Sequence, residues 1–224
     1  MDDLQTEEEQ IEEMRAWWSE YGRYVIAAVL VAVGSLIGLN QYKSGQLEGE
    51  VAASMLFESL AEYVDSGKLD AAEQIADELS NDYANMSYAA QSKLAMARLY
   101  MDKNRDLDAA DALQELLAMR GNKELQHVGR LRLARVFLYQ DKAQDVLDLL
   151  SGSDSPAFAA LYAEVRGDAL AALGHSGEAR VAYRAALGSS SQSIDRQLVQ
   201  MKLADLPPPS IEPEPQEEAA GEAE

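Results

Sequence analysis

Side chains that commonly carry enzyme chemistry are scarce in this chain. It has no cysteine, and its two histidines, His127 and His175, fall in separate parts of the sequence. We expect His175 in a turn and His127 near a helix start, as exposed or capping residues rather than metal ligands. No G-x-S-x-G, Walker or H-E-x-x-H motif is present. The sequence therefore predicts no catalytic residue, metal site or cofactor, and the chain is not expected to be an enzyme.

Two sets of residues suit binding instead. One set occupies related positions of a repeated pattern set out below and mixes apolar with charged side chains: Phe57, Arg98, Arg135, Leu138, Tyr139 and Asp168. On a concave surface these groups would suit an extended segment or a partner helix. The alternative is that several of them only pack between helices or face solvent.

The second set is Gly34-x-x-x-Gly38 with Ser35 beside it. Small residues at this spacing give a helix a face on which a second membrane helix can pack closely. Glycine is also common in membrane helices without such a role. We therefore treat Gly34, Ser35 and Gly38 as a predicted helix contact.

These glycines lie in a charge-free stretch that predicts one membrane-spanning helix. Residues 24–42, YVIAAVLVAVGSLIGLNQY, are bounded by Arg23 and Lys43. A helix of this length is about 28 Å long, close to the ~30 Å hydrocarbon core of a bilayer. A cleavable signal peptide and a buried soluble helix are the alternatives. The acidic leader and the apolar residues on every face favour an uncleaved anchor.

The flanks of this stretch bear on its orientation. Residues 1–23 form an acidic segment with an amphipathic pattern, and they contain Arg15 and Arg23. Only Lys43 lies close to the other end. The positive-inside rule then places the N-terminus in the cytoplasm and the rest of the chain across the membrane.

Net charge excludes one class of partner. The chain carries 39 acidic against 19 basic side chains, a net charge of −20. DNA and RNA phosphates would repel such a protein, so we expect no nucleic-acid partner. Residues 207–224, PPPSIEPEPQEEAAGEAE, contain no base and little apolar surface. Because such a segment buries too little to offset its ordering entropy, we predict a disordered Pro/Glu-rich tail.

Residues 51–206 are rich in helix formers and repeat a helix–turn–helix pattern, joined to the span by a predicted linker at 43–50. The four units begin at Leu60, Ala97, Ala134 and Gly167. Large apolar residues recur at Tyr63, Tyr100, Phe137 and Leu170, turn residues at Ser66-Gly67, Lys103-Asn104, Gln140-Asp141 and Leu173-Gly174, and small residues at Ala72, Ala109, Val146 and Ala179. A period in the thirties of this kind is typical of stacked helical hairpins.

A last helix is expected after Ser193, marked by Ile194, Leu198 and Met201. It would cover the open end of the stack, as terminal elements of such arrays do. The predicted fold is therefore all-α: a single N-terminal membrane helix, then a solenoid of about four hairpins plus a capping helix. An ordinary helical bundle is the alternative.

The last hairpin resembles a tetratricopeptide repeat in its placement of Gly167, Gly174, Ala179 and Tyr183. The whole order, with EEEQIEEMRAWWSEYGRY, one span, four degenerate repeats and a closing QMKLADL helix, resembles the YfgM family over residues 5–206. That resemblance implies a bacterial inner-membrane protein with periplasmic repeats. Its implied partners are the SecYEG translocon, a PpiD-like membrane-anchored prolyl isomerase, and periplasmic chaperones or translocating polypeptides.

Two functions follow as hypotheses. The first is an ancillary Sec translocon subunit, a non-enzymatic anchored scaffold that helps pass emerging polypeptides to periplasmic chaperones. The second is an anchored regulator that sequesters a signalling protein or organises an envelope complex without binding secretory clients. Only the first predicts contacts with nascent secreted chains.

Overall fold

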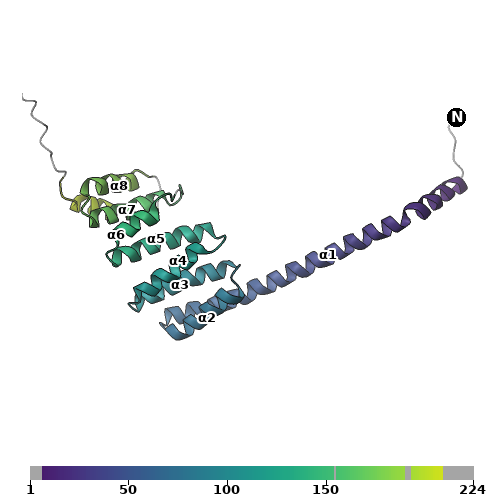
Figure 1. Ribbon diagram of the computed structural model, residues 1–224, viewed down its shortest axis with the longest axis horizontal. Helices are drawn as coiled ribbons and strands as arrows, with labels where there is room; N and C mark the ends of the chain where they lie inside the picture. Colours follow the sequence, from purple (N-terminus) through teal and green to yellow (C-terminus); the bar gives the residue numbers. More distant parts are fainter. Residues whose placement is uncertain (1–6, 154, 190–192, 209–224) are drawn as a thin grey trace, which may run out of the picture. The chain divides into compact units, whose positions relative to one another are not determined.

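The fold is all-helical, as the sequence predicts. The computed structural model describes residues 7–153, 155–189 and 193–208, and these contain nine α-helices and no strand. They are α1 Glu7–Asp65, α2 Leu69–Asp82, α3 Ser87–Asp102, α4 Asp106–Ala118, α5 Lys123–Tyr139, α6 Ala143–Leu150, α7 Ala159–Ala172, α8 Ser176–Gly188 and α9 Arg196–Asp205 (Figure 1). The chain divides into two units, Met1–Met55 and Leu56–Glu224.

Most of the first unit is formed by helix α1. This helix runs without a break through residues 43–50, which the sequence analysis assigns to a linker, so this segment is helical. The acidic segment predicted at 1–23 belongs to the same helix from Glu7 onward. The Pro/Glu-rich segment predicted at 207–224 falls outside the described residues beyond Pro208.

The second unit is a series of helical hairpins (Figure 1). Leu56–Asp65 of α1 leads into α2, and the pairs α3–α4, α5–α6 and α7–α8 follow, with α9 packed on α8. Each pair also contacts its neighbour, through α2 on α3, α4 on α5 and α6 on α7. This is the predicted solenoid of four hairpins with a capping helix.

The four hairpin turns share one backbone geometry. In each turn the second predicted residue has a positive φ between 57° and 78°: Gly67, Asn104, Asp141 and Gly174. The next residue donates its N–H to the carbonyl five positions back, at 2.8 to 2.9 Å: Lys68 to Tyr63, Arg105 to Tyr100, Lys142 to Phe137 and His175 to Leu170. This bond is the signature of a Schellman helix end. Glycine, Asn and Asp tolerate the left-handed conformation best, which accounts for the turn sequences.

Small residues let the paired helices approach closely. The four predicted positions Ala72, Ala109, Val146 and Ala179 are all completely buried. Gly167 shows the closest approach, since a Cβ added there would lie 2.5 Å from Cε1 of Tyr183. Buried apolar clusters then join α3–α4–α5, α5–α6–α7 and α7–α8–α9 along the array.

Helix α9 begins at Arg196, after an N-cap at Asp195 whose carboxylate accepts from two backbone N–H groups. Its buried face differs from the one the sequence pattern indicates. Val199 is completely buried, whereas Leu198 is 39% and Met201 52% exposed. Ile194, just before the helix, is buried as expected.

Candidate protein-binding groove

Two adjoining cavities lie over the first helices of the first three hairpins. Both are open to solvent; one, of about 420 Å³, is lined by α3, α4 and α5, and the other, of about 430 Å³, by the end of α1, α3 and α5. Arg98 and Arg132 line both cavities. We call the joint surface the arginine groove. Its first cavity is completed by Arg135 and by apolar or aromatic residues, namely Ala97, Met101, Leu113, Val136 and Tyr139.

The first cavity is cationic within an acidic protein. Among the described residues that line it, three are arginines and none is acidic. Arg98 forms two exposed ion pairs, at 3.7 Å with Asp65 and at 3.9 Å with Asp102. Arg132 donates to the Leu94 carbonyl at 3.1 Å. Burial, with the charges of Arg135 and Arg98, lowers the pKa of Arg132. Guanidinium groups remain charged in proteins, so this surface attracts anions.

Four of the predicted binding residues meet in this groove. Phe57 lines the second cavity and packs on the Tyr88 ring, with centroids 5.8 Å apart. Arg98, Arg135 and Tyr139 line the first cavity. Tyr139 is 63% exposed, which leaves its ring available at the rim.

The two other predicted residues lie elsewhere. Leu138 packs against the apolar cluster between α5, α6 and α7. Asp168 faces the capping helix and accepts hydrogen bonds from Tyr183 Oη and Lys202 Nζ, both at 2.8 Å. Neither residue lines the groove, because Leu138 packs in the α5–α6–α7 cluster and Asp168 is held by Tyr183 and Lys202.

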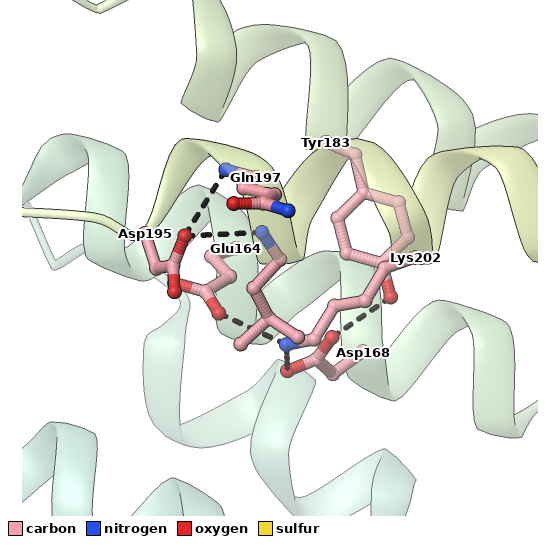
Figure 2. Close-up of polar contacts among 7 residues, drawn as sticks. Glu164, Asp168, Tyr183, Asp195, Gln197 and Lys202 are labelled. Atoms are coloured by element: carbon pink, nitrogen blue, oxygen red, sulfur yellow. Dashed lines mark hydrogen bonds and ion pairs between the residues drawn. The ribbon is translucent and has the colours of Figure 1, made fainter.

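The cluster around Asp168 fastens α9 to α7 (Figure 2). Lys202 Nζ of α9 lies between Asp168 and Glu164 of α7 and donates to the Glu164 carboxylate at 2.9 Å. Glu164 is only 6% exposed. Burial lowers the pKa of Lys202, but the two carboxylates outweigh it and hold this pKa above its ordinary value. Burial and the hydrogen bond to Asp168 raise the pKa of Tyr183.

This arrangement of hairpins agrees with comparisons to known proteins. A family model described as a tetratricopeptide repeat-like domain matches residues 15–208. The ancillary SecYEG translocon subunit of Escherichia coli (strain K12) is 32% identical over 92% of this chain and 99% of its own length. Proteins of the same name from Aggregatibacter actinomycetemcomitans and Neisseria gonorrhoeae are each 28% identical, over 89% of this chain and 97% of their own lengths. The chain belongs to the YfgM family.

The apolar part of α1 is the candidate membrane span of this YfgM-family chain. The helix contains a window with a mean hydropathy of 1.9, long and apolar enough to span a bilayer. Its large apolar side chains have no protein cover: Leu30, Val31, Leu36 and Ile37 are 64% to 69% exposed. A Cβ added at Gly34 or Gly38 meets no atom within 4 Å, so this face is open, and a helix contact there stays a prediction.

Arg132 also lines the groove, although it is not among the residues predicted from the sequence. Arg98 and Arg135 occupy equivalent positions of the repeats, and Arg132 does not. Arg132 lies three residues before Arg135 on α5 and so faces the same side of the helix. That i, i+3 spacing was the available signal. Met101 bears the same relation to Arg98 on α3.

A third cavity in this YfgM-family chain has the opposite charge. It has a volume of about 270 Å³, lies between α2, α3 and α4, and is lined by five carboxylates. Most of its polar groups are engaged with one another. Arg105 contacts Glu73 at 3.0 Å and Asp108 at 2.7 Å, and Lys93 contacts Glu115 at 2.6 Å. Burial and Glu73 raise the pKa of Tyr100 to about 12.

The histidines take structural positions. His127 packs between helices, against the expectation of an exposed or capping residue. Its ring stacks on Phe158 at 5.0 Å, and Nδ1 lies 2.6 Å from Tyr162 Oη. His175 is in the turn before α8, as expected, with its side chain 54% exposed. Within the described residues, no group of three or more His, Asp or Glu side chains is arranged so that it could hold a metal ion.

Proposed function

We propose that this chain is an ancillary subunit of the Sec translocon, a non-enzymatic scaffold anchored in the inner membrane that binds protein segments in its arginine groove. In this proposal the second unit lies in the periplasm and helps pass emerging polypeptides to periplasmic chaperones. The SecYEG translocon and a PpiD-like membrane-anchored prolyl isomerase are its neighbours in the membrane.

The arginine groove is the observation that carries this proposal. It combines guanidinium groups, an apolar floor and an exposed tyrosine over three consecutive hairpins. An extended polypeptide can place its carboxylates and apolar side chains on such a surface, and preformed repeats lower the ordering cost of binding. The anchor adds to this by raising the local concentration of the groove near chains that leave the membrane.

Co-purification tests the association with the translocon. The tagged full-length chain, extracted in mild detergent, is expected to enrich SecYEG and the prolyl isomerase over an unrelated single-pass protein. Gly34→Leu/Gly38→Leu is expected to reduce this enrichment if the small-residue face carries the contact. Gly177→Leu/Gly188→Leu outside the span is the control, because a Cβ at either position meets no atom within 4 Å. Absence of enrichment of the wild-type chain would contradict the association.

Photo-crosslinking tests client binding separately. A crosslinker in place of Tyr139 is expected to capture nascent secreted chains during export. The same crosslinker at Val181, which is 67% exposed on α8, serves as control. Crosslinks to a signalling protein alone would favour the anchored regulator instead.

Protease accessibility tests the side of the membrane. Arg15 and Arg23 before the span, against Lys43 after it, favour a cytoplasmic N-terminus. In spheroplasts, residues 51–206 are expected to be cleaved, while intact cells protect them. Protection in spheroplasts would contradict the periplasmic placement.

A further inference from the structure

The arginine groove carries more positive charge than the carboxylates near it balance, within the described residues. The first cavity holds Arg98, Arg132 and Arg135 and no acidic lining residue, in a protein with a net charge of −20. Arg98 forms only exposed ion pairs among the described residues, which are weak in water, and Arg132 donates to a backbone carbonyl. Like charges this close repel one another, so a bound carboxylate would relieve that repulsion.

One segment of the chain has complementary chemistry. Residues 209–224 contain six glutamates, no lysine or arginine, and one large apolar residue, Ile211. The family model ends at residue 208, so this segment lies outside the part shared with the family. It follows Pro208, and the carbonyl of the preceding Pro207 accepts a hydrogen bond from Arg180 Nη2 at 2.7 Å.

The segment is long enough to reach the groove. Sixteen extended residues span up to about 50 Å. Helix α9 is bound to α7, and α7 packs on α5, which carries Arg132 and Arg135. Neighbouring packed helices lie roughly 8–10 Å apart, so the path from α9 to α5 is well within reach. Tethering also gives the segment a millimolar effective concentration at the groove.

We propose that residues 209–224 bind in the arginine groove of their own chain. Their glutamates pair with Arg98, Arg132 and Arg135 through charge-assisted hydrogen bonds, which guanidinium groups can form in bidentate fashion. The segment thereby acts as a built-in competitor that an acidic, partly apolar client must displace. This proposal rests on the groove and its charges, and not on the association with the translocon.

Peptide binding in trans tests the proposal. A fluorescein-labelled peptide of residues 209–224 is titrated with full-length chain and with a chain ending at Pro208, both in non-ionic detergent micelles, by fluorescence anisotropy. The shortened chain is expected to bind saturably, and more weakly as salt is raised. The full-length chain is expected to bind about tenfold more weakly, because its own segment competes at the effective concentration of a short tether.

Matched variants locate the binding site on the shortened chain. Arg98→Glu/Arg135→Glu is expected to lower the peptide affinity at least tenfold. Arg120→Glu/Arg184→Glu changes the net charge equally at exposed positions outside the groove and is expected to leave the affinity within twofold. Thermal unfolding followed by circular dichroism checks that each variant is folded. If Arg98→Glu/Arg135→Glu does not fold, Arg98→Gln/Arg135→Gln is used in its place. A peptide with all glutamates changed to glutamine is expected not to bind.

Three results would overturn the proposal: no binding to the shortened chain, equal affinity for shortened and full-length chains, or unchanged affinity when Arg98 and Arg135 are reversed. If the peptide does not bind the shortened chain and Arg98→Glu/Arg135→Glu abolishes the client crosslinks, the groove binds an acidic segment of another protein instead. No translocon is present in the titration, so its failure and a failed SecYEG co-purification are independent results.

Discussion

At the scale of single residues, the contact between Gly167 and Tyr183 shows how tightly the fourth hairpin is packed. The tyrosine ring is 3% exposed, and its hydroxyl is held by Asp168 at 2.8 Å. The ring therefore cannot move aside easily. Residue 167 therefore has room for the α-hydrogen of glycine but not for a Cβ atom.

Gly167→Ala is expected to lower the free energy of unfolding by about 1–3 kcal/mol, since overpacking forces a shift in Tyr183 or in the backbone. Gly177→Ala is the control, because a Cβ there meets no atom within 4 Å. It is expected to be neutral or slightly stabilising, as alanine restricts the unfolded chain and favours helix. Urea titration of the full-length chain in micelles, followed by circular dichroism, measures both. Equal losses in the two variants would show that the close contact is unimportant.

Lys202 is a second residue on which stability depends. Lys202→Met leaves the buried Glu164 carboxylate without its ammonium partner, and breaking such a pair from one side is expected to cost about 3–5 kcal/mol. Glu164→Gln in the same background is expected to recover part of this loss, because an amide carries no uncompensated charge. The double-mutant cycle, read from urea midpoints, isolates the pair. Additive effects would show that the two side chains act independently.

At the scale of elements, the attachment of α9 depends on the N-cap as well as on the cluster around Lys202. Asp195 Oδ1 accepts from the Gln197 and Leu198 N–H groups at 3.0 and 3.1 Å. Asp195→Ala is expected to cost about 1 kcal/mol of stability. Asp205→Ala, at the other end of the same helix, is the control and is expected to be neutral or stabilising, since a carboxylate opposes the helix dipole there. Chemical denaturation distinguishes them, and a larger loss in the control would contradict the capping role.

Two tyrosines and one lysine that link packed helices also predict sensitivity to alkali. The folded pKa values of Tyr183 and Lys202 are raised above those of the unfolded chain, and that of Tyr100 is raised to about 12. Their stabilisation is therefore fully present below pH 10 and is lost as the pH rises through the folded values. The urea midpoint is expected to fall between pH 10 and 12. Tyr183→Phe should flatten this fall, whereas the exposed Tyr139→Phe should leave it unchanged.

The hairpins could be predicted from sequence because local geometry determines them. The left-handed turn position selects Gly67, Asn104, Asp141 and Gly174. Close helix approach selects a small residue soon after, alanine in three hairpins and valine in one, so both features recur at a similar spacing. The position of Asp168 could not be predicted in this way. It matches Arg98 and Arg135 in the repeat, but its partner Lys202 lies 34 residues away in a helix outside the repeat pattern.

The same limit applies to α9 and His127. The sequence offers this short helix two apolar sides, one with Val199 and one with Leu198 and Met201. Packing against α7 and α8 buries the side with Val199. His127 finds Tyr162 and Phe158 across a hairpin boundary, through a contact that no local spacing indicates. Groove residues can be predicted from the sequence where they occupy equivalent positions of the repeats, as Arg98 and Arg135 do.

At the scale of the whole molecule, the apolar part of α1 is the candidate membrane anchor, and its role can be tested directly. Replacing Leu30 and Ile37, 67% and 64% exposed, by lysine puts two charges into the predicted span. Each lysine near the centre of a membrane helix costs about 2.5–3.5 kcal/mol of insertion free energy, so Leu30→Lys/Ile37→Lys is expected to shift the chain from the membrane pellet to the carbonate-soluble fraction. Leu47→Lys/Val51→Lys, at exposed apolar positions outside residues 24–42, is the matched control and should remain in the pellet. Retention of both variants would mean that residues 24–42 do not anchor the protein.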